Sequence, residues 1–439
     1  MKVLKFGGTS VGSAQRMKEV AKLITDGEQK IVVLSAMSGT TNTLVEISDY
    51  LYKKNPEGAN EIINRLEAKY KQHVNELYST DEYKQKTQEF IKAQFDYIRS
   101  YTKDIFTLFE EKVILAQGEL ISTNMVTNYL QEQGVNAILL PALEFMRTDK
   151  NSEPDPVYIK EKLAAQLEIH PDAEIYITQG FICRNAYGEI DNLQRGGSDY
   201  TASLIGAAVN ASEIQIWTDI DGMHDNDPRI VDKTSPVRHL HFEEAAELAY
   251  FGAKILHPTC VQPAKYANIP VRLLNTMEPT APGTLISNDT EKGKIKAVAA
   301  KDNITAIKIK SSRMLLAYGF LRKVFEIFES YQTSIDMICT SEVGVSVSID
   351  NTKHLNEILD DLKKYGTVTV DQDMCIICVV GDLEWENVGF EAKALDAMRD
   401  IPVRMISFGG SNYNISFLIR EEDKKKALQS LSDHLFNNK

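Results

Sequence analysis

The chain of 439 residues has no apolar run long enough to span a membrane, and no charged-then-apolar leader opens it. We therefore expect neither a membrane span nor a signal peptide, and a cytoplasmic location. Its five cysteines are scattered and odd in number, which is typical of reduced thiols rather than of a disulfide framework. The chain has 62 acidic residues and 49 basic ones, which gives a net charge of −13. This balance argues against nucleic acid or an anionic membrane as partner, but a local basic pocket for a phosphorylated small molecule is still compatible with it.

The two commonest phosphate-binding motifs, G-x-x-x-x-G-K-[ST] and G-x-G-x-x-G, are also missing. Instead the chain begins with "KVLKFGGTSVG", in which a strand-like segment runs straight into Gly7 and Gly8. Backbone N–H groups of such a turn, next to a helix start, form an anion site, and Lys5 on the strand can neutralise phosphate oxygens. Taken alone, a glycine turn with an edge lysine explains the segment equally well.

Two further stretches combine small residues with single charges. In "QRGGSDYTA" a second glycine pair follows Arg195, the residue type that grips a carboxylate through two hydrogen bonds. Ser198 and Asp199 after it would also fit a helix N-cap region. In "GELIST" Glu119 lies on one helix face with Ser122, in an otherwise apolar stretch, which favours contact with a ligand amine.

Other charged motifs allow two interpretations each. Thr218 and Asp219 end a buried strand in "WTDIDGMHDNDPR", where ligands of open α/β sheets gather, although turns explain the later Asp-Gly and Asp-Pro pairs. In "FGAKILHP" we expect an apolar helix, whose Lys254 either binds phosphate or extends to solvent. His239 and His241 share one strand face, but no further Cys or His cluster accompanies them, so we predict no metal site.

The pattern of apolar residues predicts an α/β fold with a second, different region. Mostly apolar segments alternate with helical patterns over the first ~285 residues, as in a parallel sheet covered by helices. Between them, residues 57–105 predict two long helices. The expected strands are residues 2–6, 30–36, 136–142, 174–182, 214–219 and 270–274.

After a polar, turn-rich stretch near residue 280, the order helix, strand, turn, strand occurs at 320–350 and again at 390–419. This internal similarity predicts tandem βαββα-type units. The predicted domains are a catalytic domain at 1–285, a linker at 286–300 and repeats at 301–372 and 373–439; strand 304–310 could belong to either repeat.

Five motifs occur in this order and are followed by the tandem repeats: "KFGGTSVG", "SAMSGTTN", "QRGGSDYTA", "WTDIDGMHDNDPR" and "FGAKILHP". Together they closely resemble the aspartokinases. The resemblance implies an amino-acid-kinase-like α/β sandwich with a mainly parallel central sheet, plus two ferredoxin-like (βαββαβ-type) ACT regulatory domains. "TSE" at 340–342 and the length of the chain resemble the monofunctional, lysine-sensitive class, so we expect no fused homoserine dehydrogenase.

The resemblance further implies transfer of the ATP γ-phosphoryl group to the β-carboxylate of L-aspartate, the first step of lysine, threonine and methionine biosynthesis. A carboxylate needs no general base at pH 7, so the site must supply charge neutralisation and alignment. Mg²⁺ is expected to bind mainly through the ATP phosphates. The implied residues are Lys5 and Asp199 for catalysis; Lys5, Gly7, Gly8, Ser10, Thr218, Asp219, His224, Arg229 and Lys254 for ATP; and Thr41, Glu119, Arg195 and Ser198 for aspartate. Many relatives carry tyrosine at the position of His224.

The ACT resemblance implies feedback inhibition by an amino acid, expected to be L-lysine, bound where repeats meet. It also implies a homodimer, or a dimer of dimers, through these repeats. Leu316 and Ala317 stand where some lysine-sensitive relatives have polar residues. The implied effector residues are Met314, Gly319, Phe320, Ser334, Asp336, Ser341 and Glu342.

Two alternatives remain open at this point. Another kinase of the same superfamily could share the glycine motifs, although "QRGGSDYTA" and the tandem repeats count against it. A non-catalytic amino-acid sensor could keep the kinase fold, but it would have no use for Lys5, Glu119, Arg195 and Asp199 together.

Overall fold

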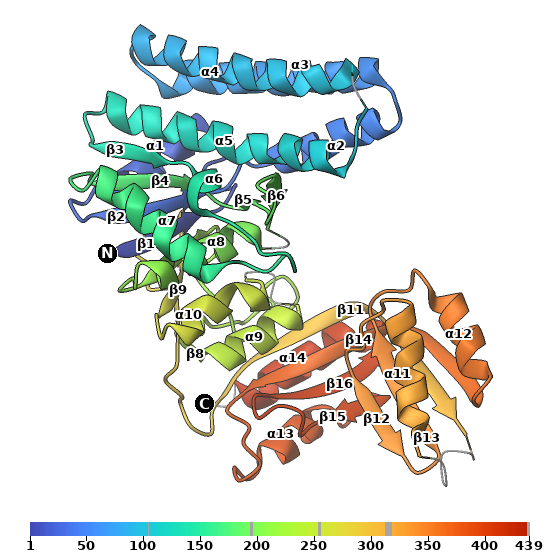
Figure 1. Ribbon diagram of the computed structural model, residues 1–439. Coiled ribbons are helices and arrows are strands. Elements are labelled where there is room, and N and C mark those ends of the chain that lie inside the picture. Colours follow the sequence, from blue (N-terminus) through green and yellow to red (C-terminus); the bar gives the residue numbers. More distant parts are fainter. Residues whose placement is uncertain (104, 194–195, 253–255, 312–317, 437–439) are drawn as a thin grey trace. The chain divides into compact units, whose positions relative to one another are not determined.

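The computed structural model describes residues 1–103, 105–193, 196–252, 256–311 and 318–436 (Figure 1). The chain forms two compact units. The first consists of residues 1–223 and 255–288, and the second of residues 224–254 and 289–439. These units differ from the domain boundaries predicted above, because segment 224–254 belongs to the second unit.

A mainly parallel sheet forms the centre of the first unit. Its strands lie in the order β3-β4-β2-β1-β7-β9-β10, and β10 pairs antiparallel to β9. All six strands predicted for this region are present, because their side chains are apolar on both faces. The strands are β1 (Lys2–Phe6), β2 (Lys30–Leu34), β3 (Ala137–Leu140), β4 (Ile175–Gln179), β7 (Ile214–Thr218), β9 (Val271–Asn275) and β10 (Thr284–Ser287).

Helices cover this sheet. The Ser13 hydroxyl accepts a hydrogen bond from the Arg16 N–H and so begins the first helix, whose buried face includes Met17 and Val20. The helices are α1 (Ala14–Ile24), α2 (Thr40–Tyr52), α5 (Leu108–Glu132), α6 (Ala142–Phe145), α7 (Pro156–Ile169), α8 (Gly197–Ala208) and α10 (Gln262–Tyr266), with short 3₁₀ turns at Tyr101–Lys103 and Pro258–Val261.

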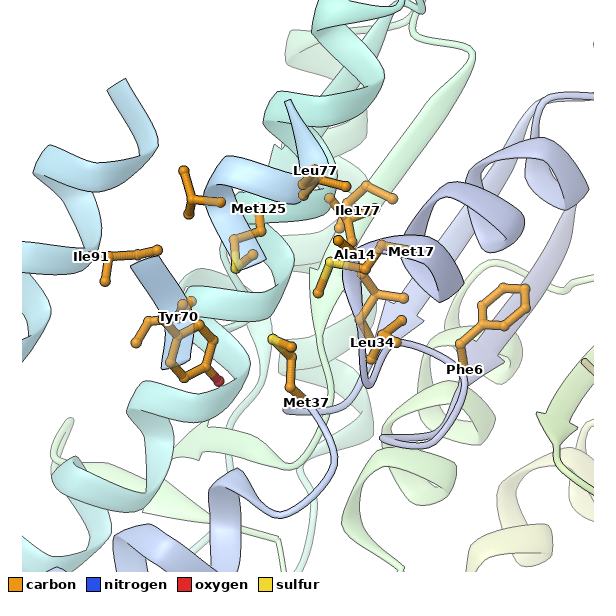
Figure 2. Packing of buried hydrophobic residues seen from close by; sticks show 14 of the residues in the cluster. Phe6, Ala14, Met17, Leu34, Met37, Tyr70, Leu77, Ile91, Met125 and Ile177 are labelled. Atoms are coloured by element: carbon orange, nitrogen blue, oxygen red, sulfur yellow. The ribbon is translucent and has the colours of Figure 1, made fainter. Parts of the chain in front are cut away.

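The two long helices predicted at 57–105 are confirmed as α3 (Pro56–Leu77) and α4 (Asp81–Ser100). They form a hairpin that lies over α2 and α5 (Figure 1). Side chains of this hairpin, such as Tyr70 and Ile91, share one buried cluster with Leu34 of the sheet (Figure 2). The hairpin is therefore part of the main core of the first unit.

Two local predictions are wrong. The strand expected at 174–182 ends at Gln179, since Phe181 has a φ of 69° and reverses the chain into the hairpin of β5 (Ile182–Arg184) and β6 (Ile190–Asn192). The helix expected at 251–258 is absent from its described residues, in which a turn follows α9 and a 3₁₀ turn begins at Pro258. Apolar composition alone does not distinguish a continuing strand or helix from an apolar turn.

The second unit contains a six-stranded sheet in the order β12-β13-β11-β14-β16-β15. The prediction of two ferredoxin-like repeats is confirmed, and each half has its own buried core with two helices. The elements are β8 (His239–His241), α9 (Phe242–Tyr250), β11 (Ile295–Lys310), α11 (Phe320–Ser330), β12 (Ile338–Ser341), β13 (Gly344–Ile349), α12 (Leu355–Lys363), β14 (Thr367–Gly381), α13 (Phe390–Ala397), β15 (Met405–Ser407), β16 (Asn414–Arg420) and α14 (Lys424–Leu435), with a 3₁₀ turn at Glu421–Asp423.

The long strands β11 and β14 lie side by side and each serves both repeats (Figure 1). Ile304 pairs with Met374, 70 positions later, so the two repeats are related by an approximate two-fold axis through this pair. The same offset relates Asn303 and Asp373, which both have positive φ values, at 59° and 54°. Residues 305–310 pair with β13, while β11 begins at Ile295, inside the predicted linker. None of the described helices is long and apolar enough to cross a membrane.

Candidate active site

A cavity of about 380 Å³ opens in the first unit. It lies where β1, β2 and β4 end and where α2 and α8 begin, so side chains from distant parts of the sequence meet there. This is the edge of a parallel sheet at which ligands usually bind. The lining residues are Lys5, Gly8, Ser35, Ala36, Met37, Ser38, Gly39, Thr41, Asn42, Glu119, Phe181, Gly196, Gly197, Ser198 and Asp199.

Lys5 and Asp199 form an ion pair in this cavity, with 2.7 Å between Nζ and Oδ1. Both side chains are only slightly exposed, at 11% and 12%. Asp199 lies in the first turn of α8, where the helix dipole favours negative charge. The pair holds the ammonium group at the cavity wall, in a fixed position.

The two glycines after β1 have different reasons to be glycine. A Cβ on Gly8 would lie 2.8 Å from the Ala36 carbonyl oxygen, so no larger residue fits. A Cβ on Gly7 would lie 3.6 Å from the Lys5 ammonium and would shield it. The Gly7 N–H already donates to the Trp217 carbonyl at 3.3 Å. The Gly8 N–H has no hydrogen-bond acceptor among the described residues.

Two helices begin at the same cavity. Gly39 is the N-cap of α2 and Gly196 the N-cap of α8, with φ values of 82° and 73°. Neither glycine offers a side chain to cap the helix. Unsatisfied N–H groups and the positive ends of two helix dipoles therefore favour anionic ligands in this cavity.

Glu119 is the buried acid of the site. Its Oε1 accepts a hydrogen bond from the Ala36 N–H at 3.1 Å, whereas its Oε2 has no partner among the residues that the structure describes. Burial raises the pKa of the Glu119 carboxyl to about 8, although the Ala36 N–H acts in the opposite direction. A ligand ammonium would satisfy the unpaired oxygen and stabilise the ionised form.

Serine hydroxyls connect the elements around the cavity. Ser35 donates to the Ser198 hydroxyl at 3.0 Å, and Ser122 donates to the Ser35 carbonyl at 2.8 Å. Ser35 and Phe181 were not predicted as site residues. The signal available for Ser35 was its place at the end of an apolar strand of the parallel sheet, whereas Phe181 lies inside the predicted strand 174–182 and gave no such signal. The positive φ of Phe181 is a strained conformation of the kind that occurs at binding sites.

Several predicted ATP residues do not line this cavity. Ser10 is fully buried, and its hydroxyl lies 2.7 Å from that of Thr276. Thr218 and Asp219 follow Trp217 at the end of β7, next to β1 in the sheet. His224 and Arg229 belong to the second unit, where the latter forms an exposed two-point pair with Asp227. Arg195 and Lys254 lie outside the described residues.

Asp336 is the buried acid of the second unit. Its side chain is 1% exposed, and Oδ1 pairs with Lys301 at 2.8 Å and accepts the Tyr250 hydroxyl at 2.7 Å. Lys301 also pairs with Asp350 at 2.9 Å, and its ammonium lies 4.4 Å from the centre of the Tyr250 ring. The predicted effector ligand Asp336 therefore already has a cationic partner in the same chain.

The other predicted effector residues are spread over the first repeat. Asp336 precedes β12, and Glu342 follows it in the turn before β13. Six residues of extended chain span about 20 Å, so one ammonium group cannot pair with both acids of one chain. Phe320 is 7% exposed and belongs to the core of the repeat. Gly319 is the N-cap of α11, Ser334 and Ser341 are exposed, and Met314 lies outside the described residues.

Within the described part of the chain, no group of three or more His, Cys, Asp or Glu side chains could hold a metal ion. The cavity instead offers the Lys5 ammonium paired with Asp199, N–H donors and the buried Glu119 carboxylate. This set suits an enzyme that brings a phosphate and a second anionic substrate together, which is the class of phosphotransferases.

Comparisons with known proteins agree with this class. The model of the amino acid kinase family matches residues 1–275, and an ACT domain model matches residues 377–435. Aspartokinase 1, chloroplastic, of Arabidopsis thaliana is 35% identical over 99% of this chain and 80% of its own. Lysine-sensitive aspartokinase 3 of Escherichia coli is 32% identical over 99% of both chains. The crystal structure of E. coli aspartokinase III with aspartate and ADP matches with a TM-score of 0.85 at 32% identity, covering 99% of this chain and 100% of that one. The chain belongs to the amino acid kinase family and, within it, to the aspartokinases.

Proposed function

We propose that this enzyme transfers the γ-phosphoryl group of ATP to the β-carboxylate of L-aspartate, forming 4-phospho-L-aspartate. The observation that carries the proposal is the unpaired oxygen of buried Glu119, in the same cavity as the Lys5 ammonium. An amino acid with a second carboxylate would place its ammonium at Glu119 and its reacting carboxylate near the Lys5 ammonium. A related enzyme has been solved in complex with aspartate and ADP.

Lys5 would neutralise the phosphoryl oxygens during transfer. Two unit charges about 4 Å apart repel by about 4 kcal/mol at an effective dielectric of ~20, so the substrates need this cation to approach each other. The Gly8 N–H would bind the same phosphoryl group. Asp199 holds the ammonium group through the observed ion pair.

Aspartate would be oriented by the remaining polar groups of the cavity. Glu119 would receive its ammonium, and Thr41 and Ser198, both on helix N-terminal turns, would receive a carboxylate together with the free N–H groups. We keep Arg195 as the ligand of the α-carboxylate, because it directly precedes the Gly196–Gly197 pair that lines the cavity.

ATP with Mg²⁺ is the proposed phosphoryl donor. Mg²⁺ is proposed to bind through the phosphates of the nucleotide, because it favours hard oxygen ligands. Thr218, Asp219, His224, Arg229 and Lys254 remain the proposed nucleotide residues.

Regulation by L-lysine is the second part of the proposal. Support comes from the ACT domain match, from the two ferredoxin-like repeats and from the lysine-sensitive relative. We propose that the second unit binds lysine at Asp336 and that the repeats form the contact of a homodimer. A cytoplasmic location is part of the same proposal.

An assay of ADP release tests these points together, with ATP, Mg²⁺ and L-aspartate, and with L-glutamate as control. Turnover that requires aspartate and falls with added L-lysine is expected. Turnover with glutamate alone would indicate another kinase of the family. A folded protein that binds aspartate without turnover would indicate an amino-acid sensor.

A further inference from the structure

The loop of residues 35–42 supplies more of the cavity lining than any other segment of the chain. It runs from the end of β2 to the first turn of α2. From α5, Glu119 accepts the Ala36 N–H and Ser122 donates to the Ser35 carbonyl, which fixes the beginning of the loop. The end of the loop, from Ser38 to Thr41, carries the N-terminus of α2, which has no side-chain cap, and the Ser38 N–H donates to the Gly8 carbonyl at 3.1 Å.

Side chains of the α3–α4 hairpin also hold this end of the loop. Tyr70 of α3 is 1% exposed, and its hydroxyl lies 2.8 Å from that of Thr40, itself fully buried. The neighbouring Lys69 donates to the Ser38 carbonyl at 3.3 Å. The Tyr70 ring packs against Phe95 of α4, with 6.0 Å between ring centres. The hydroxyl position is therefore set by the core of the hairpin, in which Tyr70 and Met37 share one cluster (Figure 2).

We infer that Tyr70 is a positioning residue for the substrate, acting through Thr40 on the N-terminus of α2. This inference rests on the proposed function, because it assumes that the cavity binds aspartate. Without the Tyr70 hydroxyl, the buried Thr40 hydroxyl loses its hydrogen-bond partner, and the cost of this unpaired group favours a shift of the helix start. A loop that visits other positions lowers the fraction of molecules ready to bind the substrate.

The test is Tyr70→Phe, with Tyr78→Phe as the matched control. Tyr78 is another buried tyrosine of the same helix hairpin, at 3% exposure, and its hydroxyl donates to the Met125 carbonyl at 2.7 Å, away from the cavity. Both variants lose one buried tyrosine hydrogen bond. Only Tyr70→Phe is expected to raise the KM for aspartate, by about tenfold, with kcat changed less than twofold and the KM for ATP unchanged.

Thr40→Val removes the same hydrogen bond from the other side. If Tyr70 acts through Thr40, the double variant is no worse than either single variant. Additive effects of the two changes, or an equal rise in KM for Tyr78→Phe, would overturn the inference. Thr40→Val alone still tests it if Tyr70→Phe fails to fold.

Hydrogen exchange provides a readout that does not depend on turnover. In the ligand-free protein, amides of residues 35–42 should exchange faster in Tyr70→Phe than in the wild type and in Tyr78→Phe. If the wild type does not turn over aspartate but exchange in residues 35–42 is still faster in Tyr70→Phe, the proposed function is wrong. The link between Tyr70 and the loop would nevertheless hold. If the wild type turns over aspartate, and Tyr70→Phe has the same KM for aspartate and the same exchange rates as the wild type, only the inference about Tyr70 is refuted.

Discussion

Glu119 and Asp336 are both buried carboxylates, but their partners differ. Glu119 accepts one backbone N–H and has an oxygen without a partner among the described residues, at the wall of a cavity. Asp336 already binds the Lys301 ammonium and the Tyr250 hydroxyl. The first site can take a ligand ammonium without breaking an interaction. At the second site, an effector ammonium has to replace the internal cation at Oδ1 or pair with Oδ2, which, like Glu119 Oε2, has no hydrogen-bond partner among the described residues.

The second repeat shows how specific the Asp336 environment is. At the positions equivalent to Lys301, Asp336 and Asp350 it carries the opposite charges. The equivalent residues are Asp371, Arg404 and Arg420. Asp371 and Arg404 pair at 2.8 Å, as Lys301 and Asp336 do. The approximate two-fold axis therefore relates similar backbones with inverted charges, and the position of Asp336 carries a carboxylate in the first repeat but an arginine in the second.

The largest effect is expected for Lys5→Met, which removes the cation of the first site. It leaves Asp199 without its partner and the phosphoryl oxygens without a counter-charge. We expect kcat to fall by about a thousandfold, the factor that corresponds to one interaction of about 4 kcal/mol. Lys112→Met is the control, because Lys112 pairs with Asp191 at 2.7 Å in the same unit. A Lys5→Met enzyme with kcat within tenfold of wild type would show that Lys5 does not stabilise the transferring group.

The next effect concerns Glu119 directly. Glu119→Gln keeps the shape and the Ala36 contact but cannot pair with an ammonium as an ion. The KM for aspartate is expected to rise by roughly tenfold to a hundredfold, with a smaller change in kcat. Asp336→Asn in the second unit should leave this KM unchanged. Equal KM values for aspartate in wild type and Glu119→Gln would place the substrate ammonium elsewhere.

Inhibition by lysine separates the two repeats. Asp336→Asn should raise the lysine concentration needed for half inhibition by about tenfold or more, because it removes the carboxylate that we propose receives the effector ammonium. Arg404→Gln changes the equivalent position of the second repeat and should leave inhibition as in wild type. Loss of inhibition in Arg404→Gln together with normal inhibition in Asp336→Asn would show that the effector binds in the second repeat, and would contradict the proposed role of Asp336. Both measurements use the same ADP-release assay.

The pH dependence of aspartate binding follows from the raised pKa of Glu119, about 8 in the ligand-free protein. Below this pH the carboxyl is mostly protonated, and binding an ammonium must first remove the proton. The KM for aspartate should therefore fall as pH rises from 7 to 8, by up to about tenfold per unit. This dependence should disappear in Glu119→Gln.

Stability should change with pH in the opposite sense. Because the folded carboxyl has a higher pKa than the unfolded one, the folded ligand-free protein binds more protons between the two values. Its free energy of unfolding should thus decrease as pH rises from about 5 to about 8, and the difference from Glu119→Gln should grow over the same range. A constant difference would contradict the assigned protonation state.

Much of this arrangement could be predicted from the sequence, for a physical reason. Parallel strands covered on both faces are continuously apolar, and the lysine, glycines and serines that follow them stand out. Lys5 stands out on an apolar strand, Glu119 in an apolar helical stretch, and Ser198 and Asp199 after a glycine pair, and one cavity contains all four. The turn at Phe181 could not be found, because an apolar residue with positive φ continues the strand pattern.

The environment of Asp336 was also not visible in the sequence. Its partners Tyr250 and Lys301 lie 86 and 35 positions away, and no local periodicity relates them. The sharing of β11 by both repeats was missed in part, since the polar stretch before it is typical of a linker. Contacts of this kind depend on the packing of complete elements, which single-sequence patterns do not describe.

The smallest effect is expected for Tyr250→Phe, which tests whether the Tyr250 hydroxyl competes with the effector for the Asp336 carboxylate. The change removes the 2.7 Å hydrogen bond to Asp336 and keeps the Lys301 pair. The free energy of unfolding should fall by about 1 kcal/mol, and half inhibition should need about twofold less lysine because one competing donor is gone. Tyr331→Phe, which removes a 2.8 Å bond to Asp361, is the control in the same repeat. Unchanged or weakened inhibition in Tyr250→Phe would mean that the tyrosine supports the effector site instead of competing for its carboxylate.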